Sequence, residues 1–145
     1  MKNKPQTVSQ QFHSNMVAII SLLVALTGLG YNTWREHVIE ENRSVRIASF
    51  EVLKNLGELE IIVYYAHYQK DQQLGNPITG WGKVLMVKEL SRVLPDPVAR
   101  NAEALSATWA KEFAKIDGDE QSVERITQSI DATRHAVLKI LGDLK

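Results

Sequence analysis

The chain has 145 residues, which is enough for one domain of ordinary size but not for two. Lys and Arg number 17, and Asp and Glu also number 17, so the formal net charge is zero. Nucleic-acid-binding proteins usually carry a basic surplus, because much of their affinity comes from neutralising phosphates, and the balance here argues against such a partner. The absence of cysteine excludes disulfides, thiolate metal ligands and a cysteine nucleophile.

Residues 14–34 contain no Asp, Glu, Lys, Arg or His. About 20 residues of helix cross a hydrocarbon core of roughly 30 Å, so we predict a single transmembrane helix over 14–34, preceded by a short tail at 1–13. Tyr31 and Trp34 follow the most apolar part of this segment, and Arg35 comes next. Amphipathic aromatic side chains beside a cation are typical of the headgroup level, and we predict that these three residues anchor the helix there.

Two other interpretations compete with a transmembrane helix. In a cleaved signal peptide, Lys2 and Lys4 would be the basic region and 16–29 the apolar region, but no A-x-A site follows and the lead before the apolar run is long. In a soluble protein the segment would be a buried core helix, but it lacks the charged face that such a helix needs in a small bundle.

A stripe of small and polar residues runs along the predicted span with the spacing 4-3-4-3-4. Its members are Ser14, Ala18, Ser21, Ala25, Gly28 and Asn32. In lipid there is little hydrophobic force between helices, and close backbone approach at small residues is what holds them together. The stripe therefore predicts contact with a membrane helix of a partner or of a second copy; chance is the alternative, since these residues are common in membrane helices.

The rest of the chain, 35–145, is predicted to be a water-soluble four-helix bundle, which makes the fold class all-α. Because no proline lies between Pro5 and Pro77, the membrane helix is predicted to continue into the first bundle helix, from about Thr7 to Gln73. Further helices are predicted over 80–94, from Pro97 to about 116 with Asp96 as N-cap, and over 120–143 after a break at 117–119. Helical spacing predicts this core: Val38, Val45, Ala48, Val52, Leu56, Leu59, Val63, Ala66, Trp81, Val84, Leu85, Leu90, Val93, Val98, Ala102, Leu105, Trp109, Phe113, Ile116, Val123, Ile126, Ile130, Thr133, Val137, Ile140 and Leu144.

Acidic and histidine side chains occur twice at spacings that suit a metal ion. Asp131 and His135 lie one helical turn apart, and Glu60 and His67 lie two turns apart, so four ligands facing one interior would resemble a carboxylate–histidine bundle site. Asp131 and His135 lie off the apolar stripe of their helix, however, and the chain has no E-x-x-H pair. We therefore predict solvated side chains and no metal site.

Other patterns for cofactors or catalysis are equally weak. Asp117, Asp119 and Glu120 lack the EF-hand spacing and fit the acidic first turn of a helix. No G-x-S-x-G is present, and the glycines at 28 and 30 lie inside an apolar run rather than after a strand. We predict no enzymatic activity and no cofactor.

Aromatic side chains gather near the predicted loop after the first helix, where a ligand pocket between helices is one interpretation and the end of the core is the favoured one. The set consists of Tyr64, Tyr65, His67, Tyr68, Trp81 and Trp109.

Several short sequences spread over most of the chain carry a resemblance to a family. They are Tyr31-Asn-Thr-Trp-Arg35, Glu41-Asn-Arg43, Phe50-Glu-Val-Leu53, Leu56-Gly-Glu58 and Gly80-Trp81. With these, the chain resembles a group of uncharacterised bacterial single-pass membrane proteins. The resemblance implies a bacterial inner-membrane location and no particular activity.

These observations predict a non-enzymatic, single-pass bacterial membrane protein, an accessory or scaffolding subunit acting through helix–helix contacts with another membrane protein or a second copy. The alternative is a membrane-anchored sensor that binds a small ligand in the bundle. The predicted tail, 1–13, is too short for an output domain, which favours the accessory role. The basic residues Lys2 and Lys4 lack nearby acids, and on this ground we expect the tail in the cytosol and the bundle on the periplasmic side.

Overall fold

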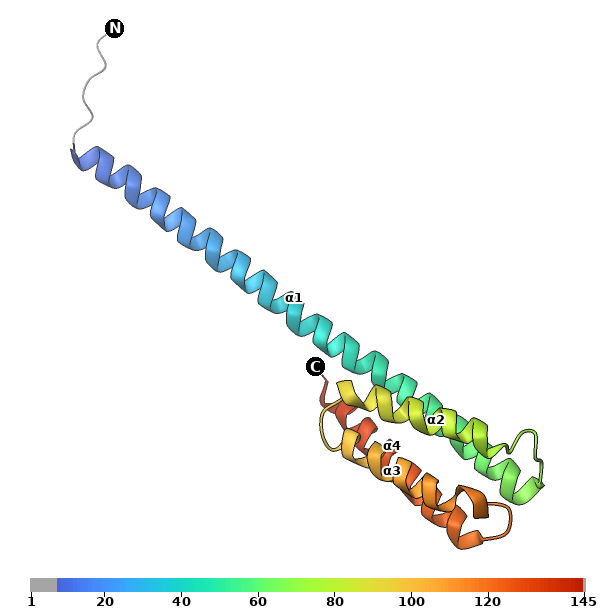
Figure 1. Ribbon diagram of the computed structural model, residues 1–145. Helices are drawn as coiled ribbons and strands as arrows, with labels where there is room; N and C mark the ends of the chain where they lie inside the picture. The colour runs from blue at the N-terminus through green and yellow to red at the C-terminus, as the bar shows by residue number, and fades with distance from the viewer. Residues whose placement is uncertain (1–7, 145) are drawn as a thin grey trace. The chain divides into compact units, whose positions relative to one another are not determined.

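The computed structural model describes the backbone of residues 8–144 and the side chains of residues 15–144. The described residues contain four α-helices and no strand, which confirms the all-α class (Figure 1). The helices are α1 (Val8–Tyr64), α2 (Pro77–Leu90), α3 (Val98–Glu112) and α4 (Glu120–Asp143), with a π-helical turn at Tyr65–Gln69 and 3₁₀ turns at Ser91–Val93 and Phe113–Lys115. The chain divides into an N-terminal unit, Met1–Glu41, and a C-terminal unit, Asn42–Lys145, and α1 contributes residues to both.

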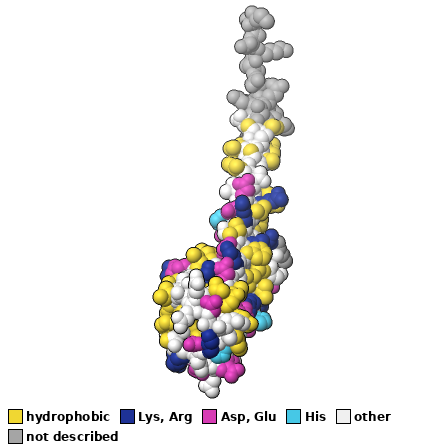
Figure 2. All heavy atoms as spheres, turned by 90° about the vertical axis from the view of Figure 1, so that its right-hand side faces the viewer, with side chains coloured by type: hydrophobic (Ala, Val, Ile, Leu, Met, Phe, Trp, Pro, Cys, Tyr) yellow, Lys and Arg dark blue, Asp and Glu magenta, His cyan; other side chains and the backbone are white. Residues whose placement is uncertain are grey.

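The described part of the N-terminal unit is a single stretch of α1 whose side chains, from residue 15 onward, are all exposed. An 18-residue window near its start has a mean hydropathy of 1.7, and none of it is buried within the protein. In Figure 2 hydrophobic side chains cover this stretch before charged ones begin. The helix is therefore long and apolar enough to span a membrane, as a signal sequence also is. Its complete exposure contradicts the interpretation as a core helix of this chain.

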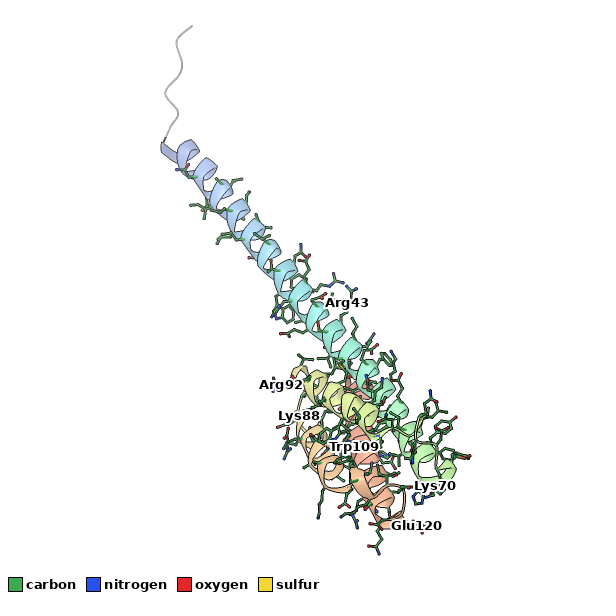
Figure 3. All side chains as sticks on the ribbon, turned by 45° about the vertical axis from the view of Figure 1, so that its right-hand side comes forward. Arg43, Lys70, Lys88, Arg92, Trp109 and Glu120 are labelled. Carbon is green, nitrogen blue, oxygen red and sulfur yellow. The ribbon has the colours of Figure 1, made fainter. Side chains whose placement is uncertain are left out.

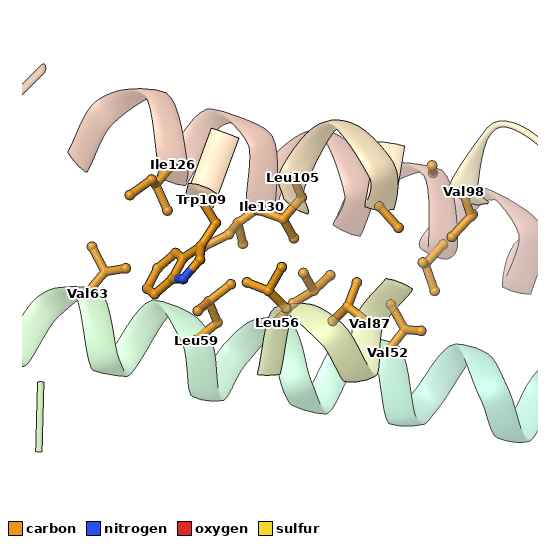
Figure 4. Packing of buried hydrophobic residues seen from close by; sticks show 14 of the residues in the cluster. Val52, Leu56, Leu59, Val63, Val87, Val98, Leu105, Trp109, Ile126 and Ile130 are labelled. Atoms are coloured by element: carbon orange, nitrogen blue, oxygen red, sulfur yellow. The ribbon is translucent and has the colours of Figure 1, made fainter. Parts of the chain in front are cut away.

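In the C-terminal unit, all four helices contribute side chains to one hydrophobic core (Figure 4). Its fully buried members include Leu56 and Leu59 from α1, Leu105 from α3, and Ile126 and Ile130 from α4. Burying such a side chain contributes about 1.5–3 kcal/mol to folding, so this unit has a stabilising interior that the described N-terminal stretch lacks. Of the predicted core, Val45, Ala66, Trp81, Leu90, Phe113, Ile140 and Leu144 are only half-buried, and Val38 is exposed.

The face that α2 turns inward was predicted in part, because Val84 is buried and Trp81 and Leu90 pack against the core. Leu85 and Val93 are 49% and 61% exposed, although both were predicted to lie in the core. The buried positions of this segment are Gly80, Val84, Val87 and Ser91. The physical reason is Trp109 of α3, which is fully buried: a Cβ atom on Gly80 would lie 2.2 Å from Cζ2 of the Trp109 ring. The indole therefore occupies the space beside Gly80, and this contact sets the rotation of α2.

The helix starts differ from the predictions in two places. α2 begins at Pro77 rather than near residue 80, because the Asn76 side chain accepts a hydrogen bond from the Ile78 amide at 2.8 Å and caps the helix. α3 begins at Val98, so Asp96 lies too far from its first turn to cap it. The Asp96 carboxylate instead lies 3.7 Å from the guanidinium of Arg100.

The start of α4 and the break before it agree with the sequence. Asp119 is the N-cap, and its Oδ1 accepts a hydrogen bond from the Gln121 amide at 3.1 Å. The helix then runs to Asp143, where the apolar repeat ends.

Candidate functional site

The small-residue stripe lies on α1 within the N-terminal unit. Ala18, Ser21, Ala25, Gly28 and Asn32 are all exposed, whereas the side chain of Ser14 lies outside the described residues. At 3.6 residues per turn, the 4-3-4-3 spacing keeps these positions on one face. A Cβ atom added to Gly28 would meet nothing within 4 Å, so the stripe is open to a neighbouring helix.

In this segment, side chains off the stripe form hydrogen bonds to their own helix, whereas the described polar side chains on the stripe do not. Off the stripe, Thr27 Oγ1 donates to the Leu23 carbonyl at 2.7 Å and Thr33 Oγ1 donates to the Leu29 carbonyl at 3.0 Å. Within the part of the chain that is described, the side chains of Ser21 and Asn32 on the stripe have no hydrogen-bond partner. An unpaired polar group is unfavourable in hydrocarbon, so Ser21 would need a partner there, whereas Asn32 would lie beside the predicted headgroup anchors at the end of the span.

The predicted headgroup anchors lie together at one end of the apolar stretch. The rings of Tyr31 and Trp34 have centroids 6.1 Å apart and are tilted by 44°. They are 59% and 62% exposed, and Arg35 beside them is exposed as well. This is the combination that occurs where a membrane helix leaves the hydrocarbon region.

Of the four side chains considered as metal ligands, only the two carboxylates lie close together, and an arginine pairs with both of them. Arg134 of α4 forms an ion pair with Glu60 of α1 at 2.5 Å and a second one with Asp131. His67 Nδ1 lies 2.7 Å from the Ile116 carbonyl, and His135 Nδ1 lies 2.8 Å from the Asp131 carbonyl. The guanidinium thus holds both carboxylates and links α4 to α1. Among the described residues, no group of three or more potential ligands is placed to bind a metal ion.

A polar network that sequence reasoning missed joins the end of α3 to the start of α4. Glu112 is 1% exposed, and its carboxylate Oε2 accepts from Arg125 Nη2 at 3.0 Å and from Ser122 Oγ at 2.7 Å. Lys115 Nζ lies 3.5 Å from the same oxygen and is the second cation beside it. The hydrogen bonds from Arg125 and Ser122, and the charge of Arg125 and Lys115, lower the pKa of Glu112 to about 2 despite its burial.

Asp119 shares the same two donors. Its Oδ2 lies 2.5 Å from Ser122 Oγ and 3.5 Å from Arg125 Nη2, and the hydrogen bond with Ser122 is the main cause of its lowered pKa. The serine hydroxyl has a single proton, so it donates to one carboxylate at a time, while Arg125 donates to the hydroxyl at 3.1 Å. This network, which we call the Glu112 clasp, pairs opposite charges and links the end of α3 to the start of α4. Because its members come from different helices, no local spacing in the sequence points to it.

A cavity of about 380 Å³ lies at the end of the C-terminal unit where α1 connects to α2. Lys70, which has a left-handed backbone with φ 55°, reaches across to Asp117 with an ion pair of 3.0 Å. Lys70 and Glu120 mark this end in Figure 3. The lining residues are Ala66, Lys70, Asp71, Gln72, Gly75, Asn76, Pro77, Phe113, Ala114, Ile116 and Asp117. None of the six aromatic residues suggested for a pocket lines it: Trp109 is core, and Tyr64 and Tyr68 stack at 5.3 Å on the surface.

No family model, curated protein or solved structure matches the chain. The resemblance to bacterial single-pass membrane proteins therefore stays a prediction.

Proposed function

We propose that the chain is a non-enzymatic, single-pass protein of a bacterial inner membrane, an accessory or scaffolding subunit that contacts another membrane protein or a second copy through its membrane helix. The observation that carries the proposal is the pair Ser21 and Asn32, whose side chains lack partners among the described residues and lie on the small-residue face. The threonines off that face bond to their own helix.

Two physical effects would act together on this face. The small side chains let a second helix approach closely, so van der Waals contacts accumulate along the stripe. The hydroxyl of Ser21 and the amide of Asn32 then find donors or acceptors on that helix instead of remaining unpaired in or near lipid. A helix that served only to anchor the bundle would require neither feature.

The proposed location rests on the same helix and on its flanks. Tyr31, Trp34 and Arg35 would lie at the headgroup level on one side, and the bundle beyond them on the periplasmic side. In this arrangement residues 14–34 contact lipid and the membrane helix of the partner. The soluble bundle can then contact other parts of the complex.

The test uses two glycines that differ only in the face they occupy. Gly28 is on the stripe, and Gly30, two residues further on, points about 200° away from it. A Cβ atom at either position meets nothing within 4 Å, so both Gly28→Leu and Gly30→Leu are compatible with the helix. We expect Gly28→Leu to abolish association of the full chain in an in-membrane two-hybrid assay, or its co-purification with the partner, because leucine forces the backbones apart.

Gly30→Leu is the matched control and should associate like the unchanged protein. Equal association of the two variants would contradict the proposal, since the stripe would then make no contact and the helix would be an anchor alone.

The cavity beside Lys70 favours a second candidate function, a membrane-anchored sensor for a small ligand. Its volume of about 380 Å³ is in the range of small-molecule sites. Native mass spectrometry of the full chain extracted from its own membranes should then detect a bound small molecule. Ala114→Phe, at an exposed position of the cavity wall, should displace it. If the extracted chain carries no ligand, the proposed sensor function is contradicted.

A further inference from the structure

Within the C-terminal unit, α1 has a second apolar face besides the one that forms the core. The core face contains Val52, Leu56, Leu59 and Val63, which are 0–3% exposed. The second face, which we call the outer stripe, has the spacing 3-4-3-4-3 and is formed by Ile47, Phe50, Lys54, Gly57, Ile61 and Tyr64. Its large apolar members are 50–58% exposed, whereas the core face of the same helix is buried among side chains of α2, α3 and α4.

The outer stripe is more regular than scattered surface hydrophobicity. Single exposed apolar residues are normal on a soluble domain and carry no information. An alternating spacing of three and four residues is the pattern of a coiled-coil seam, in which the first and fourth positions of each heptad face a partner helix. In that register Ile47, Lys54 and Ile61 take one seam position and Phe50, Gly57 and Tyr64 take the other.

The charges that flank the outer stripe indicate which helix covers it. In a parallel coiled coil, the residue just before one heptad lies opposite the fifth residue of that heptad on the partner helix. These two flanking positions are Arg46 and Glu51. Arg46 is exposed and has no ion-pair partner among the described residues, and Glu51 has only the surface contact with Lys54 at 3.7 Å. Two parallel copies would place each Arg46 opposite a Glu51.

We propose that the outer stripe is the seam of a parallel coiled coil between two copies of this chain. The parallel orientation rests on the proposed function, because two copies inserted the same way into one membrane run in the same direction. Lys54 is the one charged residue of the seam, and a lone lysine there fixes the register while weakening the pair. Confinement to the membrane keeps such a weak pair associated.

The experiment exploits the natural absence of cysteine, since one introduced cysteine is then the only thiol. Gly57→Cys places it in the seam, where a Cβ atom meets nothing within 4 Å and folding is unimpeded. Ala107→Cys is the control on an exposed position of α3. Both full-length variants are reconstituted in phosphatidylcholine–phosphatidylglycerol vesicles, oxidised with copper phenanthroline and separated on non-reducing gels. A disulfide needs Cα atoms within about 7 Å, so we expect Gly57→Cys to become mostly dimer while Ala107→Cys stays monomer.

Charge exchange tests the pairing itself. In the Gly57→Cys background, Arg46→Glu should lose most of the dimer band, and adding Glu51→Arg should restore it, because the pair is then reversed. Monomeric Gly57→Cys, or loss without restoration, would overturn the seam.

A parallel experiment with Gly28→Cys separates this result from the membrane-helix contact. Dimer at Gly28→Cys without dimer at Gly57→Cys overturns the seam and leaves the proposed function intact. Dimer at Gly57→Cys alone supports the seam and counts against pairing of membrane helices between copies.

Discussion

Leu23 and Leu56 lie on the same helix, α1, but Leu23 is 58% exposed and Leu56 is fully buried. Around Leu56 the apolar residues of the core face pack against three other helices, and ion pairs such as Arg134–Glu60 lie at the margins. Around Leu23 apolar side chains point in every direction and no described residue covers them. The two parts of this helix therefore differ in their surroundings: the later part is stabilised by packing against the rest of its unit, whereas the earlier part is uncovered and is long and apolar enough to span a membrane, as a signal sequence also is.

The largest effect is expected from removing the centre of the core. Trp109→Ala should lower the free energy of unfolding of the C-terminal unit by about 3–5 kcal/mol, through lost burial and the cavity that remains. Urea unfolding of the full chain in detergent, followed by circular dichroism, measures this. Leu23→Ala is the control and should leave the transition unchanged; equal effects would erase the difference between the two parts of α1.

A second substitution pair tests the fit between α2 and Trp109. Gly80→Ala places a methyl group against the indole and should destabilise the unit by about 1–3 kcal/mol. Gly82 lies two residues further along α2, and a Cβ atom there meets nothing within 4 Å. Gly82→Ala should therefore stabilise the unit by up to about 1 kcal/mol, because alanine has the higher helix propensity. Thermal unfolding of both variants provides the measurement, and a stabilising Gly80→Ala would show that α2 has a different rotation.

Acid should weaken only the C-terminal unit. The folded pKa of Glu112, about 2, lies below the ordinary value of 4.5, so the unfolded chain takes up this proton first. The contribution of Glu112 to stability is therefore complete above about pH 4.5 and is lost as the pH falls toward 2. Unfolding midpoints measured across this range should fall less steeply in Glu112→Gln than in the unchanged protein. An unaltered slope would mean that the clasp with Arg125 and Ser122 does not form.

The smallest effect is expected in the proposed membrane helix. Ser21→Ala should weaken association by about 0.6 kcal/mol, the average for an interhelical hydrogen bond in lipid. Thr27→Val removes a hydroxyl that bonds its own backbone and should leave association unchanged. Energy-transfer titration in vesicles resolves the difference. A larger loss with Thr27→Val would place the contact on the opposite face.

Much of the fold could be predicted from the sequence, because apolar spacing and helix breakers are local signals. The break at Asp117–Asp119 and the helix after it are correct, and so is the buried face of α3 apart from the half-buried Phe113. The inward position of Gly80 could not be predicted, since glycine carries no hydrophobic signal and the Trp109 ring beside it comes from another helix. Asn76 and Pro77 precede the helix predicted over 80–94, although they cap and start α2.

The candidate sites also differ in whether the sequence alone reveals them. The small-residue stripe is a periodic feature of one helix and is visible in the sequence, whereas the free side chains of Ser21 and Asn32 become apparent only beside the bonded threonines. The Glu112 clasp and the Arg134 bridge join residues from different helices, so they depend on tertiary packing that no local spacing encodes.

Carbonate extraction of cells that express the full chain with a C-terminal tag tests whether residues 14–34 hold the protein in a membrane. Because the segment has no charge and its described side chains are uncovered, we predict that the tagged protein stays in the membrane pellet at its full mass. A soluble tagged species that begins near Gly30 would show that the segment is a cleaved signal peptide and would contradict the account.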